Sequence, residues 1–408
     1  MSTAHSPFES VPLAPRDPIL GITEAFVADD RKTKVNLGVG VYQDADGKVP
    51  VMAAVREVER MRAATVPTRS YLPIDGIGLY NSSAQKLLFG EDAAVIADGR
   101  VVTVQALGGT GALKVGADFL KQTSPDAEIL ISDPSWENHL ALFTNAGFKV
   151  RSYPYFDEKT FGLDFDGMLG ALESAKAGTI VVLHGCCHNP TGVDPDRAQW
   201  KQILDVVVSR GLVAFVDLAY QGFADGIDAD AWVARTLADS GAEFLVSTSF
   251  SKSFALYGER IGALSVVTAD KSEAARVLSQ LKRMIRTNYS SPPTQGAAAV
   301  AAVLADPKLR TVWEDELGGM RERIRAMRVG LVVRLRTRMP HVNFDHIAKQ
   351  RGMFSYSGLN AAQAKRLRDD FGIYILDTGR ICVAALNEHN IDTVADAIAA
   401  VSQERLAA

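Results

Sequence analysis

The 408-residue chain has few cysteines and no hydrophobic stretch long enough to cross a membrane. Its three cysteines, two of them adjacent as Cys186 and Cys187, do not make a disulfide framework. A membrane-spanning helix needs a run of roughly 18 apolar residues, and the chain contains none. We therefore expect a reduced, cytoplasmic protein.

The chain also lacks an excess of positive charge and a recognisable export signal. Its formal net charge of −4 argues against nucleic acid or an anionic membrane as the main partner. The segment from Met1 to Pro7 has no basic stretch followed by an apolar one. With 47% hydrophobic and 23% charged residues, the composition is that of an ordinary globular protein, and the length favours two domains.

Short apolar segments alternate with helical stretches from about residue 50 onward. Their continuous apolar character is typical of strands that are covered on both faces. The helical stretches between them predict right-handed crossovers and an α/β fold with a mostly parallel sheet. The predicted strands are Val101–Val104, Ile129–Ile131, Ile180–Leu183, Leu212–Val216, Phe244–Val246 and Ala263–Val267. Ligands in such folds bind beyond the carboxyl ends of the strands, so the residues that follow each strand are the candidates for function.

The pattern changes near residue 318. A long helix follows, with an apolar face formed by Met320, Ile324, Met327, Leu331 and Leu335. We expect its other face, with Arg321, Arg325, Arg328 and Arg336, to be solvated. Short strands are predicted near Phe354–Tyr356, Tyr374–Leu376 and Ile381–Ala384, with a closing helix from Ile391.

Three regions are predicted from these patterns. Residues 1–16 form an arm, residues 50–317 form a large domain, and residues 17–49 together with 318–408 form a smaller α+β domain. Asp17 and Pro18 have the cap and first-turn character of a helix start.

A glycine-rich turn follows the first predicted strand. Gly108, Gly109, Thr110 and Gly111 open a helix, whose free N–H groups and dipole favour an anion. The glycines are not spaced G-x-G-x-x-G, so we interpret the turn as a site for a single phosphate rather than a dinucleotide.

Polar and aromatic residues follow the next strands. Trp136 is able to stack on a flat ring. Asp217, at the end of a buried strand, needs a cation nearby, which is either a protonated pyridine nitrogen or an ordinary salt-bridge partner. Tyr220 is placed to hydrogen-bond a ring hydroxyl. The histidines and cysteines of residues 184–188 lie too close together in one turn to surround a metal ion, and we expect no metal site.

A serine-rich turn after the strand Phe244–Val246 presents Lys252. A lysine that condenses with an aldehyde must be kept from bulk water, so that its amine is neutral at working pH. Taken alone, Lys252 would more commonly be a solvated surface residue. The nearby Ser249 and Arg260 suit an anionic group such as a phosphate.

Together these segments resemble the fold-type I pyridoxal-phosphate aminotransferases, in the branch that contains the aspartate and aromatic amino-acid aminotransferases. The similarity extends from Asp17 to the closing helix. The motifs that carry it are Gly108–Gly111, Asn189–Gly192, Asp217–Tyr220, and Ser249–Lys252 with Arg260.

The resemblance implies a role for each cofactor-binding residue. Lys252 would bind pyridoxal phosphate covalently and, once displaced, would move the proton between the substrate Cα and the cofactor's C4′. Asp217, supported by His139, would pair with the pyridine nitrogen. The remaining ring contacts would come from Trp136 and Ala219 on the two faces and from Asn189 and Tyr220 at the ring oxygen. The phosphate would be held by Gly108, Gly109, Thr110, Ser249, Arg260 and Tyr71 of the partner subunit in a homodimer.

The substrate-binding residues are likewise implied by the resemblance. Arg380 would clamp the α-carboxylate, with help from Gly40 and Asn189 and with Trp136 beside it. Arg286 of the partner subunit would meet the side-chain carboxylate of aspartate or glutamate.

The preferred amino acid stays open at this point. Segments such as Trp136–His139 and Tyr71–Pro73 are closer to bacterial aromatic aminotransferases, whereas Val41, Gln43 and Ser70 are smaller or more polar than is typical of them. We expect a ping-pong exchange between tyrosine, phenylalanine or aspartate and 2-oxoglutarate. An aspartate aminotransferase acting mainly on dicarboxylates is the alternative. Two more distant alternatives are a lyase or decarboxylase on the same scaffold and a non-catalytic sensor.

Overall fold

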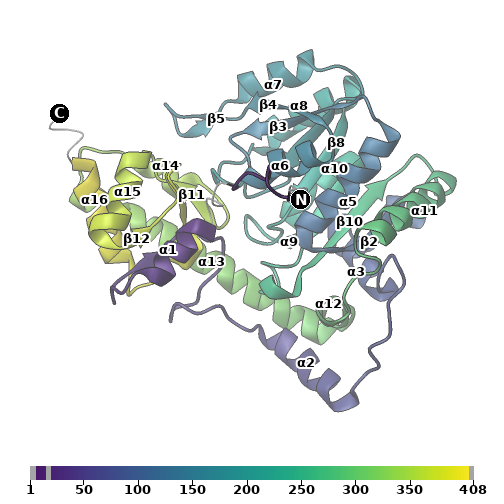
Figure 1. The fold of residues 1–408 in the computed structure, drawn as a ribbon, viewed down its shortest axis with the longest axis horizontal. Coiled ribbons are helices and arrows are strands. Elements are labelled where there is room, and N and C mark those ends of the chain that lie inside the picture. Colours follow the sequence, from purple (N-terminus) through teal and green to yellow (C-terminus); the bar gives the residue numbers. More distant parts are fainter. Residues whose placement is uncertain (1–5, 15–19, 404–408) are drawn as a thin grey trace, which may run out of the picture.

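A computed structural model describes residues 6–14 and 20–403. The helix start predicted at Asp17 and Pro18 lies outside these residues. Figure 1 shows a large unit built on a central sheet and, beside it, a smaller group of helices and short strands. The long helix α13 (Pro307–Arg338) extends along both units.

The central sheet has seven strands in the order β2-β10-β9-β8-β7-β3-β4. All pairs are parallel except those that β10 makes with β2 and β9. The strands are β2 (Val101–Leu107), β3 (Glu128–Asp133), β4 (Lys149–Pro154), β7 (Ile180–His184), β8 (Val213–Leu218), β9 (Phe244–Ser249) and β10 (Ile261–Val267). The predicted α/β class and all six predicted strands are confirmed. Only the edge strand β4, which is largely exposed, was not predicted.

Both faces of this sheet are covered, which explains the unbroken apolar runs. Along β8, Phe215 packs into one core, while Ala214 and Val216 pack into the core on the opposite face. The first core includes α5 (Gly108–Thr123), α6 (Glu137–Asn145) and α11 (Lys271–Asn288). The second includes α3 (Gly78–Phe89), α7 (Phe165–Ser174), α8 (Arg197–Ser209), α10 (Trp232–Asp239) and α12 (Gln295–Ala305). The remaining elements of this unit are α2 (Ala53–Thr65), α4 (Ala94–Ala97), β5 (Phe156–Asp157), β6 (Gly162–Leu163), α9 (Ile227–Asp230) and the 3₁₀ turn Tyr257–Glu259.

The smaller unit joins segments from the two halves of the sequence. Strand β1 (Val35–Asn36) pairs in parallel with β12 (Ile373–Tyr374), and β11 (Phe354–Tyr356) pairs antiparallel with β13 (Arg380–Cys382). Its helices are α1 (Leu20–Ala28), α14 (Asp345–Lys349), α15 (Ala361–Phe371) and α16 (Ile391–Gln403), with a 3₁₀ turn at Val383–Ala385. The short strands and the closing helix were predicted, but the exact domain boundaries stay predictions.

Helix α13 confirms one sequence expectation and corrects another. The apolar stripe from Met320 to Leu335 is buried as predicted. The assignment of Arg328 to the solvated face is wrong, because its side chain is only 2% exposed. Residues 347–355 fold over this part of the helix and offer backbone carbonyls to the guanidinium.

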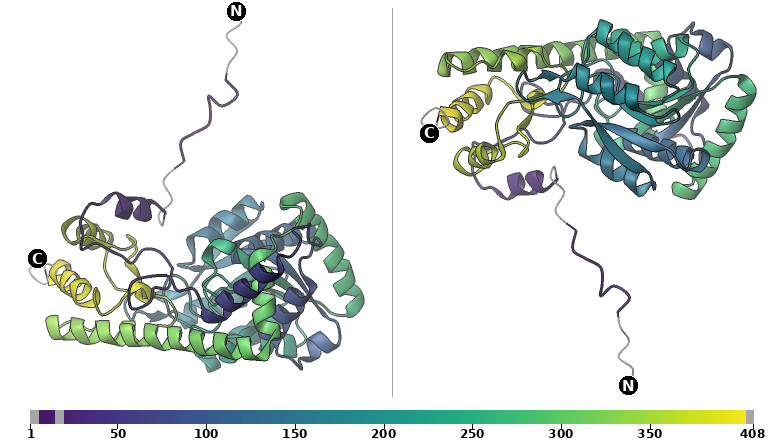
Figure 2. Two further views of the ribbon diagram at one scale, coloured as in Figure 1. Left: turned by 90° about the horizontal axis from the view of Figure 1, so that it is seen from below. Right: turned by 90° about the horizontal axis from the view of Figure 1, so that it is seen from above.

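The N-terminal segment and the apolar character of the helices bear on how the protein meets its surroundings. Residues 6–14 extend away from the body, and Phe8 and Leu13 are exposed there (Figure 2). Among the residues that the structure describes, no helix combines the length and apolar character that crossing a bilayer requires.

Candidate active site

A cavity of about 250 Å³ opens beyond the carboxyl ends of β7, β8 and β9, where the small unit meets the large one. Most of the residues that the sequence singled out line it. They are Gly40, Gly109, Thr110, Trp136, Asn189, Asp217, Ala219, Tyr220, Ser249, Lys252, Arg260 and Arg380. Residues far apart in the chain therefore converge on one site.

The remaining three predicted residues lie outside the cavity wall. Gly108 sits directly behind it, at the start of α5. Tyr71 is 94% exposed and Arg286, near the end of α11, is exposed as well. Neither Tyr71 nor Arg286 lines the cavity of its own chain, and their action across a dimer interface stays a prediction.

Lys252 lies in the turn between β9 and β10, with its Nζ atom 4.9 Å from the centre of the Tyr220 ring. Loss of hydration in the cavity lowers the pKa of Lys252 to about 8, and the charge of Arg260 acts in the same direction. Asp217 opposes this shift without cancelling it. A substantial fraction of the amine is therefore neutral near physiological pH, as a nucleophile requires.

The first turn of α5 forms one end of the cavity. No side chain caps this helix, so its first N–H groups are available to a ligand. Gly108 has a φ of +70°, and a Cβ atom there would lie 2.6 Å from Nη2 of Arg260. Ser249 and Ser251 face the same space. Hydroxyl groups, free N–H groups and a guanidinium together make a site suited to a phosphate.

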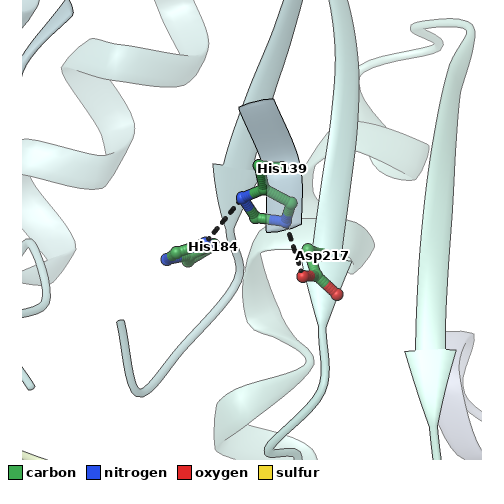
Figure 3. Close-up of side chains that lie close together, drawn as sticks. All are labelled: His139, His184 and Asp217. Atoms are coloured by element: carbon green, nitrogen blue, oxygen red, sulfur yellow. Dashed lines mark hydrogen bonds and ion pairs between the residues drawn. The ribbon is translucent and has the colours of Figure 1, made fainter. Parts of the chain in front are cut away.

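Asp217 lines the same cavity from the end of β8. Figure 3 shows that His139 stands between Asp217 and His184. Nε2 of His139 is 3.0 Å from Oδ2 of Asp217, and its Nδ1 is 2.9 Å from the Ser135 hydroxyl. Burial raises the pKa of Asp217, but the hydrogen bond from His139 and nearby positive charge, including that of Lys252, outweigh it and hold the pKa below its ordinary value. The cavity wall thus carries an anion at Asp217, which fits a protonated pyridine nitrogen.

His184 completes this group from the end of β7. Its Nε2 is 3.4 Å from Nδ1 of His139, and burial lowers its pKa to about 3, so it is neutral. The ligand atoms of His139, His184 and Asp217 all lie within 4.8 Å of one another. However, the His139 nitrogen nearest Asp217 already donates a proton to the carboxylate, an arrangement that serves hydrogen bonding rather than metal ligation. That the protein uses no metal stays a prediction.

Arg380 enters the cavity from β13 and is 1% exposed. It donates to Oδ1 of Asn189 at 3.1 Å and to the carbonyl of Gly38 at 2.6 Å, while its Nε has no partner in the described part of the chain. No carboxylate among the described residues pairs with this guanidinium. A buried, unpaired cation beside a cavity favours an anionic ligand, and a carboxylate matches its geometry.

Several cavity residues were not recognised from the sequence. Phe354 and Tyr257 are the most informative. The Phe354 ring lies 4.3 Å from the Arg380 guanidinium, and the Tyr257 hydroxyl accepts a hydrogen bond from the backbone of Tyr42. The others are Leu113, His184, Cys186, Cys187 and Ser251. Tyr257 lies five residues after Lys252, but nothing in its type indicated that it lines the cavity.

Comparison with known proteins gives a consistent picture. A family model described as aminotransferase class I and II matches residues 32–398. The chain is 57% identical over 394 residues to an aspartate aminotransferase of Pseudomonas aeruginosa, covering 97% of this chain and 99% of that one. It is 50% identical to the aromatic-amino-acid aminotransferase of Escherichia coli, with 97% and 100% covered.

Solved structures of aminotransferases are also similar to this chain. The aromatic-amino-acid aminotransferase of Burkholderia pseudomallei, covalently bound to pyridoxal phosphate, superposes with a TM-score of 0.95 at 64% identity, with 97% and 99% of the two chains covered. An aromatic amino-acid aminotransferase of Psychrobacter sp. B6, cocrystallised with aspartic acid, gives 0.95 at 44% identity, with 97% and 100% covered.

Proposed function

The chain belongs to the class I and II aminotransferases, and we propose that its site exchanges amino groups between aromatic amino acids or aspartate and 2-oxoglutarate. It is an enzyme that uses pyridoxal phosphate. The observation that carries the proposal is the placement of three groups around one cavity. These are the amine of Lys252, the anion of Asp217 and the unpaired guanidinium of Arg380.

When bound, pyridoxal phosphate supplies an aldehyde that condenses with amines and a ring that withdraws electrons from the substrate. The chain supplies the rest. We assign the phosphate to the first turn of α5, with Ser249 and Arg260, and the ring nitrogen to Asp217. Trp136 and Ala219 lie at the cavity wall as candidates for the two ring faces, and Asn189 and Tyr220 for the ring oxygen.

Lys252 has two assigned tasks. Its amine, which loses its proton more readily than that of an ordinary lysine, would hold the cofactor between reactions. Once the substrate amine has replaced it, Lys252 would accept the proton from the substrate's α-carbon and deliver it to C4′ of the cofactor, and the second half-reaction would run this transfer in reverse. A pKa of about 8 suits both directions, because neither protonation state is strongly disfavoured at neutral pH.

Arg380 is assigned to the α-carboxylate, oriented by Asn189 and the Gly38 carbonyl. This fixes the amino group of the substrate toward Lys252. Both half-reactions use the same binding position at Arg380, because amino acids and 2-oxo acids each carry a carboxylate next to the reacting carbon. The two reactants therefore bind in turn, as a ping-pong reaction requires.

The relatives are named for both aspartate and aromatic substrates, which favours a dual specificity. Titration of the purified enzyme with tyrosine, phenylalanine and aspartate in separate half-reactions tests the proposal. Each should convert the cofactor from its aldehyde to its amine form, followed by absorbance. Conversion by aspartate alone would establish the dicarboxylate alternative, and release of CO₂ or ammonia in place of amino transfer would contradict the proposal.

We further propose that the enzyme is a homodimer in which Tyr71 and Arg286 complete the site of the partner subunit. Their exposure in the single chain supports this. Mixed dimers of the Lys252→Ala and Arg286→Ala chains provide the test. If Arg286 acts across the interface, one of the two sites in each mixed dimer is intact and activity on aspartate returns. If it acts within its own chain, mixing restores nothing. A cytoplasmic location is also proposed, in line with three buried cysteines that form no disulfide.

A further inference from the structure

Arg328 is a charged side chain buried without a charged partner. It lies in the middle of α13, is 2% exposed and forms no ion pair with any described carboxylate. Its guanidinium donates to the carbonyls of Gly352 at 2.5 Å and of Phe354 at 3.3 Å, and also to the hydroxyl of Ser355. Burial lowers the pKa of Arg328 to about 10. Burying a charge in this way is costly, so the contacts that it makes need a reason.

Most of the acceptors of Arg328 belong to one short segment, residues 352–355, and a longer contact of 3.4 Å reaches the carbonyl of Ile347. The segment is held on its other side by the large unit. A Cβ atom on Gly352 would lie 2.4 Å from Cβ of Cys187, and a Cβ atom on Gly192 would lie 2.6 Å from the Phe354 carbonyl. The backbone N–H of Arg351 donates to the Gly192 carbonyl at 2.7 Å. The segment is therefore clamped between α13 and the turn that carries Asn189.

Phe354 extends from this segment into the cavity. Its ring lies 4.3 Å from the guanidinium carbon of Arg380 and meets the Tyr220 ring edge-on, with centres 6.1 Å apart. A Cβ atom on Gly40 would lie 2.5 Å from Cζ of Phe354. The ring thus fills the space between Gly40, Tyr220 and Arg380, and it covers one face of the guanidinium.

We propose that Arg328 is a positioning residue for carboxylate binding. By donating to the carbonyls on either side of Met353, it fixes the backbone of residues 352–355 and thereby the Phe354 ring. The ring in turn holds the Arg380 guanidinium in the plane that a substrate carboxylate must meet. This inference rests on the proposed function, because it takes Arg380 as the carboxylate-binding residue.

The alternative is that Arg328 only stabilises the fold. Carboxylate binding separates the two roles, and succinate, an unreactive dicarboxylate, serves as the probe of the holoenzyme. Arg328→Met should raise the Kd for succinate and the KM for amino acids about tenfold or more, while kcat changes less than about threefold. The absorbance of the bound cofactor should change little, because no hydrogen bond or ion pair in the described part of the chain links Lys252 or Asp217 to residues 352–355. Arg328→Lys keeps the charge and should recover part of the affinity.

Arg336→Met is the matched control. Arg336 lies on the same helix, is exposed and pairs with Asp345 rather than with residues 352–355. Its replacement should leave succinate binding as it is in the unaltered enzyme.

A double-mutant cycle tests whether Arg328 acts through Phe354. Phe354→Leu should weaken succinate binding by itself, and adding Arg328→Met should weaken it little further. If the increases in the Kd for succinate caused by the two substitutions multiply in the double variant, the proposal is overturned. A lower melting temperature for Arg328→Met with unchanged succinate affinity would overturn it as well. If Arg328→Met does not fold, the same cycle with Arg328→Lys decides the question.

Arg380→Lys separates this inference from the proposed function. If Arg380→Lys leaves succinate binding intact, the carboxylate assignment itself fails. If it weakens binding but Arg328→Lys and Arg328→Met do not, only the positioning role of Arg328 fails.

Discussion

Nε2 of His139 donates a hydrogen bond to the buried carboxylate of Asp217 across 3.0 Å. This bond does more than satisfy two polar groups inside the protein. It helps to hold the pKa of Asp217 below its ordinary value despite burial, which favours a negative charge in the cavity wall. His139 from α6 and Asp217 from β8 thereby form one hydrogen-bonded pair.

Asp217→Asn should preserve the shape of this pair but remove its charge. Without an anion beside it, a pyridine nitrogen loses its proton and the ring becomes a weaker electron acceptor. We expect kcat to fall roughly 10²- to 10³-fold, comparable to the loss of one strong electrostatic contact in other active sites. Stopped-flow measurement of the half-reaction with aspartate checks this. Asp217→Glu keeps the charge and should lose less, so equal losses in the two variants would contradict the explanation.

The amine of Lys252 should titrate well below an ordinary lysine. Its protonated form is disfavoured in the folded protein, so the neutral fraction rises with pH and is half-complete at about 8. Exposed lysines reach this point near pH 10.4. In the cofactor-free protein, acetylation of Lys252, followed by mass spectrometry, should therefore reach half its maximal rate near pH 8. Exposed lysines in the same sample are the internal control, and a Lys252 profile that matched theirs would refute the shift.

Gly108→Ala should weaken cofactor binding. The new methyl group would lie 2.6 Å from Arg260 and would occupy a position with φ of +70°. Overpacking of this kind costs about 1–3 kcal/mol, which corresponds to an increase in Kd of roughly 5- to 150-fold. Equilibrium titration of the cofactor-free protein with pyridoxal phosphate measures the change.

Gly319→Ala is the control for Gly108→Ala. Gly319 lies within α13, and a Cβ atom there would meet nothing within 4 Å. The substitution should leave cofactor affinity unchanged and should raise the free energy of unfolding by about 0.5–1 kcal/mol. An equal loss of affinity in both variants would show that the space around Gly108 is not the cause.

Arg286→Ala should separate the two substrate classes. If Arg286 meets the side-chain carboxylate, its loss removes a charged hydrogen bond of about 1.5–3 kcal/mol. The kcat/KM for aspartate should then fall roughly 10- to 150-fold, while kcat/KM for phenylalanine changes little. Steady-state kinetics with the two donors check this, and parallel losses would contradict the assignment.

The sheet and most of the cavity were predictable because their signals are local. Strands buried on both faces read as unbroken apolar runs, and the residues after β2, β8 and β9 carry recognisable types at fixed spacing. The edge strand β4 gave no such run, because most of its side chains are exposed.

Arg328 and Phe354 show what the sequence did not reveal. Arginines on a helix opposite an apolar stripe usually face water, and the pattern contains no sign that a later segment will cover one of them. Phe354 was correctly placed in a short strand, but its position beside Arg380 depends on how residues 352–355 pack against Cys187 and Gly192. Such contacts follow from tertiary packing rather than from any local pattern.

Gly40 and Arg380 both line the cavity, and Arg380 donates a hydrogen bond to the carbonyl of Gly38, which lies 342 residues earlier in the chain. A ribosome makes the reactive lysine long before it makes the arginine that orients a substrate. The growing polypeptide therefore carries a nucleophilic amine before it contains Arg380, which would orient a substrate toward that amine. Competence for turnover arrives late in translation, when β13, which bears Arg380, pairs with β11.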